Sequence, residues 1–186
     1  MFGKDRIDKF EVYNDSNRDL VNLFQVIRDK PLDLLVELRL YPLNARDDFN
    51  CLTAYLRHDE LYESTFQANL KRQLELTEII LPGPKASELK ELLLHRAELG
   101  DVRRAAMFLK VLRTSYASTG RSFGGQPFSM DGLNRLIIQA SKRLREVVIE
   151  NLDFEQLILR NDRKDTFIYC DPPYVESEHF YGIFTW

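Results

Sequence analysis

The chain has 186 residues, enough for one domain with a real core or for one domain that carries an insertion. Its apolar and charged fractions, 44% and 30%, exclude a disordered or fibrous protein. No apolar run is long enough to span a bilayer, residues 1–10 are too charged for a secretion signal, and Cys51 and Cys170 lack metal-ligand spacing. We therefore expect a cytoplasmic protein with no membrane partner.

The N-terminal part of the chain predicts one strand followed by helices. Residues 10–13 form a short apolar run, and the polar turn at 14–17 holds side chains that cap helices. Apolar residues then recur at helical spacing from Leu20 to Ile27. Pro31 fits the first turn of a second helix.

The middle of the chain predicts a long helical block. Two helices that separate near residues 57–59 fill the stretch from Ala45 to Leu81, and the Pro-Gly-Pro run at 82–84 ends the second. Further helices are expected over residues 86–99, 102–117 and 131–145, with a Gly- and Ser-rich loop at 118–129.

Strand signals return only after this block. Residues 146–150 and 166–170 are short, β-branched or aromatic, and flanked by polar residues. The order is therefore a strand, many helices, then two strands. The simplest architecture that fits is a helix-dominated α/β fold with a helical insertion between strands of the sheet.

Charge is distributed unevenly along the chain. Residues 101–145 contain nine basic and two acidic side chains, a net charge of +7, whereas residues 146–186 have a net charge of -6. A phosphate-binding face beside a separate site for a cation would need such a distribution. A solvated helix surface would explain the basic segment equally well, and the charge alone leaves both interpretations open.

The tetrapeptide Asp171-Pro172-Pro173-Tyr174 directly follows the last predicted strand. Ligands of open α/β sheets bind beyond the carboxyl ends of strands. Consecutive prolines stiffen the backbone, so a carboxylate and a rigid carbonyl can together accept both hydrogens of an exocyclic amino group. Tyr174 can stack on a flat base. Two such acceptors would favour a more tetrahedral adenine N6, whose lone pair can attack a methyl sulfonium.

The segment from Phe167 to Tyr174 resembles the catalytic motif of amino methyltransferases, and the chain as a whole resembles the Dam-like (D12 class, alpha group) DNA adenine-N6 methyltransferases. The resemblance implies methyl transfer from S-adenosylmethionine to adenine N6 in double-stranded DNA. Residues 11–22 are similar to the family's second cofactor motif, in which Asp15 would accept hydrogen bonds from the ribose hydroxyls. Asp15 could also act as a helix N-cap, and the two roles can coexist.

Residues 151–155 resemble the segment that contacts the cofactor's adenine, with Asp153 facing the amino group and Phe154 the ring. Phe154 could equally belong to the core. The resemblance also implies a partial Rossmann-like methyltransferase lobe at residues 1–30 and 146–186, and an all-helical target-recognition insertion at 31–145. Its candidate DNA contacts are Arg113, Ser118, Arg121 and Ser122.

The family's Phe-x-Gly-x-Gly-type cofactor loop and its later motifs have no counterpart in this chain, so the resemblance predicts an incomplete enzyme. Sheet edges left unpaired would then pair with each other, with a second copy, or with a complementing chain. The alternatives are a catalytically inactive remnant that still binds DNA, and a helical scaffold or regulator. The family-level context is a restriction–modification system or a prophage. His58, His95 and His179 lack ligand spacing, so no metal site is expected.

Overall fold

The computed structural model of the chain describes residues 10–41, 45–81, 83–125 and 130–171. Helices dominate this part of the chain, and two short strands form a small parallel sheet. In chain order the elements are β1 (Glu11–Asn14), α1 (Arg18–Asp29), α2 (Pro31–Leu40), α3 (Arg46–Arg57), α4 (Asp59–Ile80), α5 (Pro84–Glu98), α6 (Gly100–Thr114), the 3-10 turn η1 (Tyr116–Ser118), α7 (Met130–Leu144), β2 (Val147–Glu150) and α8 (Phe154–Asn161).

Local sequence signals explain where several helices begin. The side chain of Asn17 accepts hydrogen bonds from the backbone N–H groups of Asp19 (3.0 Å) and Leu20 (3.2 Å), and this caps α1. Pro31 and Pro84 stand in the first turns of α2 and α5, where a missing N–H is tolerated. The predicted helices therefore form close to their expected limits.

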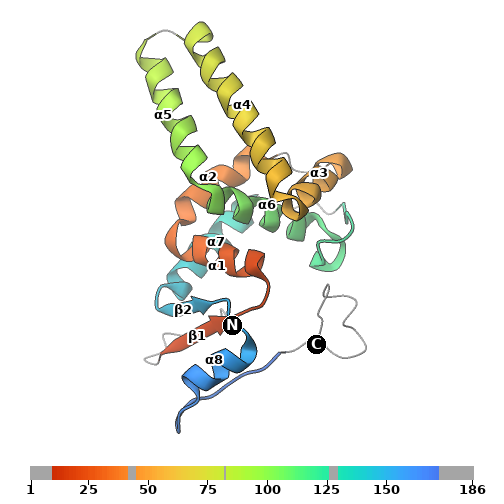
Figure 1. Cartoon of the computed structure of the whole chain (residues 1–186), viewed down its shortest axis with the longest axis vertical. Coiled ribbons are helices and arrows are strands. Elements are labelled where there is room, and N and C mark those ends of the chain that lie inside the picture. Colours follow the sequence, from red (N-terminus) through yellow and green to blue (C-terminus); the bar gives the residue numbers. More distant parts are fainter. Residues whose placement is uncertain (1–9, 42–44, 82, 126–129, 172–186) are drawn as a thin grey trace.

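One apolar core joins the helical block to the sheet, and α6 lies at its centre (Figure 1). Helices α1, α2, α6 and α7 pack together with β2 through buried side chains that include Val26, Leu34, Leu38, Val102, Ala105, Ile137, Leu144 and Val147. A second, smaller cluster between α3 and α6 consists of Phe49, Leu52, Met107 and Val111. Because α6 contributes to both clusters, few of its side chains can face solvent.

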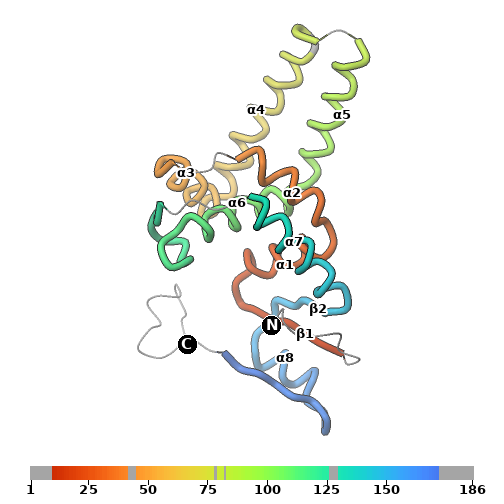
Figure 2. Tube along the Cα trace, turned by 180° about the vertical axis from the view of Figure 1, so that it is seen from behind, coloured from red at the N-terminus to blue at the C-terminus, as the bar shows by residue number. Residues whose placement is uncertain are grey.

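The two strands lie side by side in parallel, with Asn14 opposite Glu150 at the end of the register. Alternate residues of β2, Val147 and Ile149, are buried against the helical block. Helices α1 and α7 lie on one side of the strand pair and α8 lies on the other (Figures 1 and 2). Since the strands are parallel, their carboxyl ends meet at the same edge, which is the edge expected to carry a site.

Helices α4 and α5 form a hairpin that projects from the rest of the molecule (Figure 1). None of the side chains of α5 is fully buried, and Ile79 and Ile80 near the tip are 80% and 69% exposed. None of the helices in the described part of the chain has the length and apolar character that crossing a bilayer requires.

Two sequence predictions about secondary structure are wrong. Residues 166–170 form no strand, and the side chains of Phe167 and Tyr169 are 87% and 78% exposed. A strand needs a partner for its backbone hydrogen bonds, and no other described strand lies beside this segment. Helix α6 ends at Thr114 instead of residue 117, because Ser115 forms a β-bridge with Phe123.

Candidate functional site

The carboxyl edge of the sheet brings together residues that are far apart in sequence. Asp15 follows β1 directly, and Asn151 to Asp153 follow β2. The backbone N–H of Asp15 donates to the carbonyl of Glu150 at 3.4 Å, so the contact between the two strands continues past the last residue of β1. The sequence-predicted cofactor residues therefore all lie at this edge: Asp15 in the loop after β1, and Asp153 and Phe154 where the loop after β2 leads into α8.

The carboxylate of Asp15 is held in a fixed orientation. Its Oδ2 accepts a hydrogen bond from the Tyr13 hydroxyl at 3.0 Å, and its Oδ1 accepts one from the backbone N–H of Asn17 at 2.8 Å. Burial, followed by the charge of Asp15 and this hydrogen bond, raises the pKa of Tyr13, so the phenol stays protonated and donates. An ionised carboxylate has about four lone-pair sites, so it can accept further hydrogen bonds from ligand hydroxyls.

The capping role proposed as an alternative for Asp15 belongs instead to Asn17, whose side chain caps α1. Asp15 lies two residues before Asn17, and its carboxylate stabilises the turn between β1 and α1 by accepting from the Asn17 N–H. The half-buried carboxylate of Asp15 therefore lies at the end of β1 and is not the N-cap of α1.

Asp153 and Phe154 begin α8, a helix that the sequence analysis did not predict. The Asp153 side chain accepts a hydrogen bond from the backbone N–H of Glu155 at 2.9 Å and so acts as the N-cap. Phe154 is 66% exposed, so the alternative that it belongs to the core is wrong. An Asp followed by apolar residues at helical spacing, here Leu157 and Ile158, was the available signal.

Of the four predicted catalytic residues, Asp171 is exposed and is the last described residue of its segment. Pro172, Pro173 and Tyr174 lie outside the described residues. The segment before them makes a turn after α8, in which the Thr166 hydroxyl donates to the carbonyl of Asn161 at 2.6 Å. The described residues therefore bring the cofactor candidates together but do not join Asp171 to them.

The loop after α6 presents three of the four candidate DNA-contact residues. Ser118, Arg121 and Ser122 are exposed, and Arg113 is exposed on the last turn of α6. The carboxyl ends of the strands and this loop lie on the same side of the molecule (Figures 1 and 2).

This loop is closed by backbone hydrogen bonds at its base. The N–H of Tyr116 donates to the carbonyl of Ser122, and the N–H of Gly124 donates to the carbonyl of Thr114, both at 2.8 Å. A Cβ on Gly124 would come within 2.9 Å of the Tyr116 nitrogen, so this close approach requires glycine. Gly124 thus has a packing role, and the two hydrogen bonds close the base of the loop.

Much of the basic segment is used inside the fold. Arg103 and Lys110 are 2% and 1% exposed, Arg104 pairs with Asp19 and Asp59, and Arg143 pairs with Glu11 at 2.6 Å. These four side chains are buried or paired with carboxylates of other elements. They therefore form neither a phosphate-binding face nor a solvated surface, which were the two interpretations of the net charge of +7.

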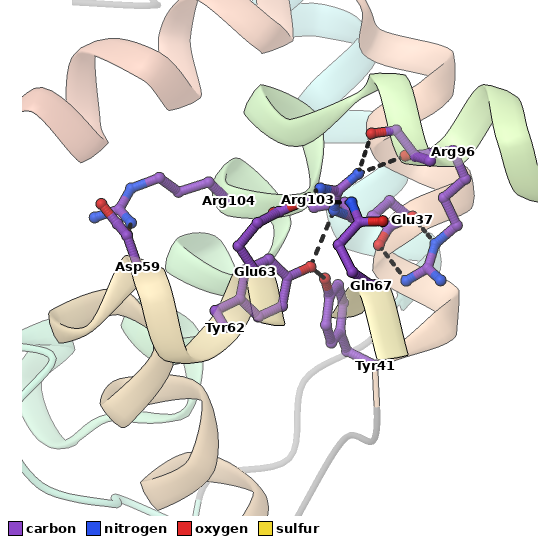
Figure 3. A network of polar contacts seen from close by, with 10 residues as sticks. Glu37, Tyr41, Asp59, Tyr62, Glu63, Gln67, Arg96, Arg103 and Arg104 are labelled. Atoms are coloured by element: carbon purple, nitrogen blue, oxygen red, sulfur yellow. Dashed lines mark hydrogen bonds and ion pairs between the residues drawn. The ribbon is translucent and has the colours of Figure 1, made fainter. Parts of the chain in front are cut away.

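Arg103 connects the base of the α4–α5 hairpin to the body (Figure 3). Its guanidinium donates to the carbonyls of Arg96 (2.7 Å) and Ala97 (2.9 Å) in the last turn of α5 and to the Tyr62 hydroxyl (3.1 Å) of α4. It also stacks 3.8 Å from the centre of the Phe66 ring. Nearby, Arg96 forms a bidentate ion pair with the buried Glu37 of α2, both distances being 2.7 Å.

A hollow of about 300 Å³ lies along α4 and is lined by Gln67, Leu70, Lys71, Leu74 and Glu75. It shares no residue with the carboxyl edge of the sheet or with the loop after α6. We therefore place the candidate site at the strand ends and not at this hollow.

Comparison with known proteins gives one family. The model of the D12 class N6 adenine-specific DNA methyltransferases matches residues 4–185, nearly the whole chain. Neither the comparison with curated proteins nor that with solved structures gave a match. The family match extends over the two strands, the helical block between them and the Asp-Pro-Pro-Tyr segment. The chain belongs to the D12 class N6 adenine-specific DNA methyltransferases.

Proposed function

We propose that the chain uses S-adenosylmethionine as its methyl donor, binds it at the carboxyl edge of β1 and β2, and acts on double-stranded DNA at a specific site. The observation that carries the proposal is the oriented carboxylate of Asp15 at the end of a parallel strand. A carboxylate in this position suits the two hydroxyls of a ribose, which can donate to its unused lone pairs.

The residues that follow β2 suit the base of the nucleoside. Asp153 carries a carboxylate that can accept from the amino group of adenine, and the exposed ring of Phe154 offers a flat apolar surface for its base. The donor set at this edge is thus compatible with an adenosine. When bound, S-adenosylmethionine would supply an electrophilic methyl group.

Asp171 to Tyr174 would act on the target base. Asp171 and the carbonyl beside it would accept the two hydrogens of the adenine amino group and hold the nitrogen lone pair toward the methyl group. Tyr174 would stack on the base after it leaves the duplex. Double-stranded DNA would contact Arg113, Ser118, Arg121 and Ser122 at the loop after α6.

We further propose that residues 31–145 act as the target-recognition unit and residues 1–30 with 146–186 as the catalytic unit. The boundary rests on the position of the strands at both ends of the helical block. The shared core of α1, α2, α6 and α7 would hold the two units together as one body.

Titration calorimetry with S-adenosylmethionine tests the cofactor site. Asp15→Ala should weaken binding at least tenfold, because charge-assisted hydrogen bonds are worth about 1.5–3 kcal/mol. Asp165→Ala, which removes an exposed carboxylate from the turn after α8, is the matched control and should bind like the wild type. Equal affinity in all three proteins would contradict the proposed site.

Methyl transfer to unmethylated DNA then tests catalysis. Asp171→Asn should abolish transfer while leaving cofactor affinity unchanged, because this side chain would contact the base and not the donor.

A second candidate function is DNA binding without catalysis. It is favoured because residues 166–170, which directly precede the catalytic motif, form no strand and pair with neither described strand. Cofactor and DNA binding without any methyl transfer by the wild-type chain would support that second candidate.

A further inference from the structure

The Asn14 side chain joins the two loops at the carboxyl edge of the sheet. Its Nδ2 donates to the carbonyl of Leu152 at 2.9 Å, and its Oδ1 accepts from the N–H of Leu152 at 2.8 Å. A primary amide presents a donor and an acceptor side by side, as a backbone peptide does. Asn14 therefore continues the strand pairing beyond Glu150 by means of its side chain.

A second asparagine makes the reciprocal contact. The Nδ2 of Asn151, in the loop after β2, donates to the carbonyl of Asp15 at 2.6 Å. Each loop is thus held by an asparagine side chain from the other strand end. Asn14 directly precedes Asp15, and Asn151 lies two residues before Asp153. We call Asn14 and Asn151 the amide clasp.

We propose that the amide clasp positions the cofactor-binding carboxylates, so that Asn14 and Asn151 are positioning residues for S-adenosylmethionine binding. This inference rests on the proposed cofactor site. Beyond the last residue pair of the strands, Asn14 and Glu150, the backbone N–H of Asp15 still donates to the carbonyl of Glu150, and the amide clasp adds three hydrogen bonds between the two loops. The ribose and the base of one adenosine have a fixed span, so the two carboxylates can contact both only when the loops are held at a matching separation.

A purely structural clasp would have a different signature. It would lower the melting temperature when it is removed, but the folded fraction would bind the cofactor with unchanged affinity. A positioning clasp changes the affinity of the folded protein, and it does so only while both carboxylates are present. Coupling between Asn14 and Asp153 therefore separates the two roles.

The experiment measures S-adenosylmethionine affinity by calorimetry, at a temperature well below each variant's melting temperature. Asn14→Leu, which keeps the side-chain size and removes both hydrogen bonds, should weaken binding about tenfold. Asn151→Ala removes one bond from an exposed residue and should weaken binding several-fold. Asn69→Ala, an exposed asparagine on α4, is the control and should have no effect.

The double variant Asn14→Leu with Asp153→Ala completes the test. If the clasp positions Asp153, the second substitution should add much less to the loss than it does alone. Because Asn14 is half-buried, Asn151→Ala with Asp153→Ala repeats the cycle at a site where folding is less at risk.

The outcomes are distinguishable. Unchanged affinity in both clasp variants, with Asp15→Ala still losing binding, would overturn the positioning role and leave the cofactor site standing. Fully additive losses in both cycles would also overturn it. Wild-type affinity in Asp15→Ala would remove the proposed site and the inference with it.

Discussion

Helix α6 and the loop that follows it belong to the same basic segment, yet their charged side chains differ in exposure. Within α6, Arg103 and Lys110 are buried and Arg104 pairs with α1 and α4. At the end of the helix and in the loop, Arg113 and Arg121 are exposed. The difference comes from position, because α6 contributes to both apolar clusters, whereas Arg113 and Arg121 lie at and beyond its C-terminal end. A net charge counted along a sequence therefore overstates what can reach a phosphate.

The largest effect that would sharpen this comparison is expected at Arg103. Arg103→Met should lower the free energy of unfolding by about 3–5 kcal/mol, because it removes the buried guanidinium that donates to the carbonyls of Arg96 and Ala97 and stacks on Phe66. Denaturant unfolding measures the change. Arg135→Met, on an exposed position of α7, should change stability by no more than about 0.5 kcal/mol. Equal stability of the two variants would break the comparison.

A smaller, pH-dependent effect is expected at Lys110. Burial lowers the pKa of Lys110 from 10.5 to about 8 in the folded protein. Between these two values the unfolded chain binds more protons than the folded one, so the free energy of unfolding rises with pH across that window. The rise attributable to Lys110 is roughly 3 kcal/mol. Lys110→Met should remove it.

The measurement for Lys110 is the free energy of unfolding of both proteins at several pH values from 7 to 11. Other groups titrate in this range, so the quantity of interest is the difference between wild type and variant. A difference that does not change with pH would show that Lys110 keeps an ordinary pKa in spite of its burial.

The smallest effect concerns the exposed part of the segment. Arg121→Ala should weaken binding to double-stranded DNA about tenfold and reduce the dependence of log affinity on log salt by about one. Stability should stay within about 0.5 kcal/mol, because the side chain is exposed. Fluorescence anisotropy at several salt concentrations measures the affinity, with Arg72→Ala on α4 as the control. Equal losses in both variants would mean that the loop has no special part in binding.

Sequence signals that act over a few residues predicted the helices well. Periodic apolar residues marked α1, Pro31 marked the start of α2, and the break near His58 separates α3 from α4 as expected. Strands β1 and β2 also form within a residue or so of the prediction. The family and the position of the cofactor candidates at strand ends followed from motifs that keep their residues close together.

The wrong predictions share a physical cause. Residues 166–170 have the composition of a strand, but a ladder requires a second strand, which a local pattern does not supply. Helix α8 was missed because Asp153 and Phe154 were interpreted as ligand contacts, or Phe154 as a core residue, and not as the start of a helix. The end of α6 was misplaced because Ser115 pairs with Phe123 eight residues away.

The sequence by itself determined the helical block, the positions of strands β1 and β2, and the chemical types available at their ends. These features depend on propensity, periodicity and short motifs, all of which act between near neighbours. Only the tertiary structure decided that Arg103 and Lys110 point inward and that Asn14 and Asn151 join two loops separated by more than a hundred residues. Such outcomes depend on which surfaces meet when the chain packs, and a one-dimensional pattern contains that information only through the whole fold.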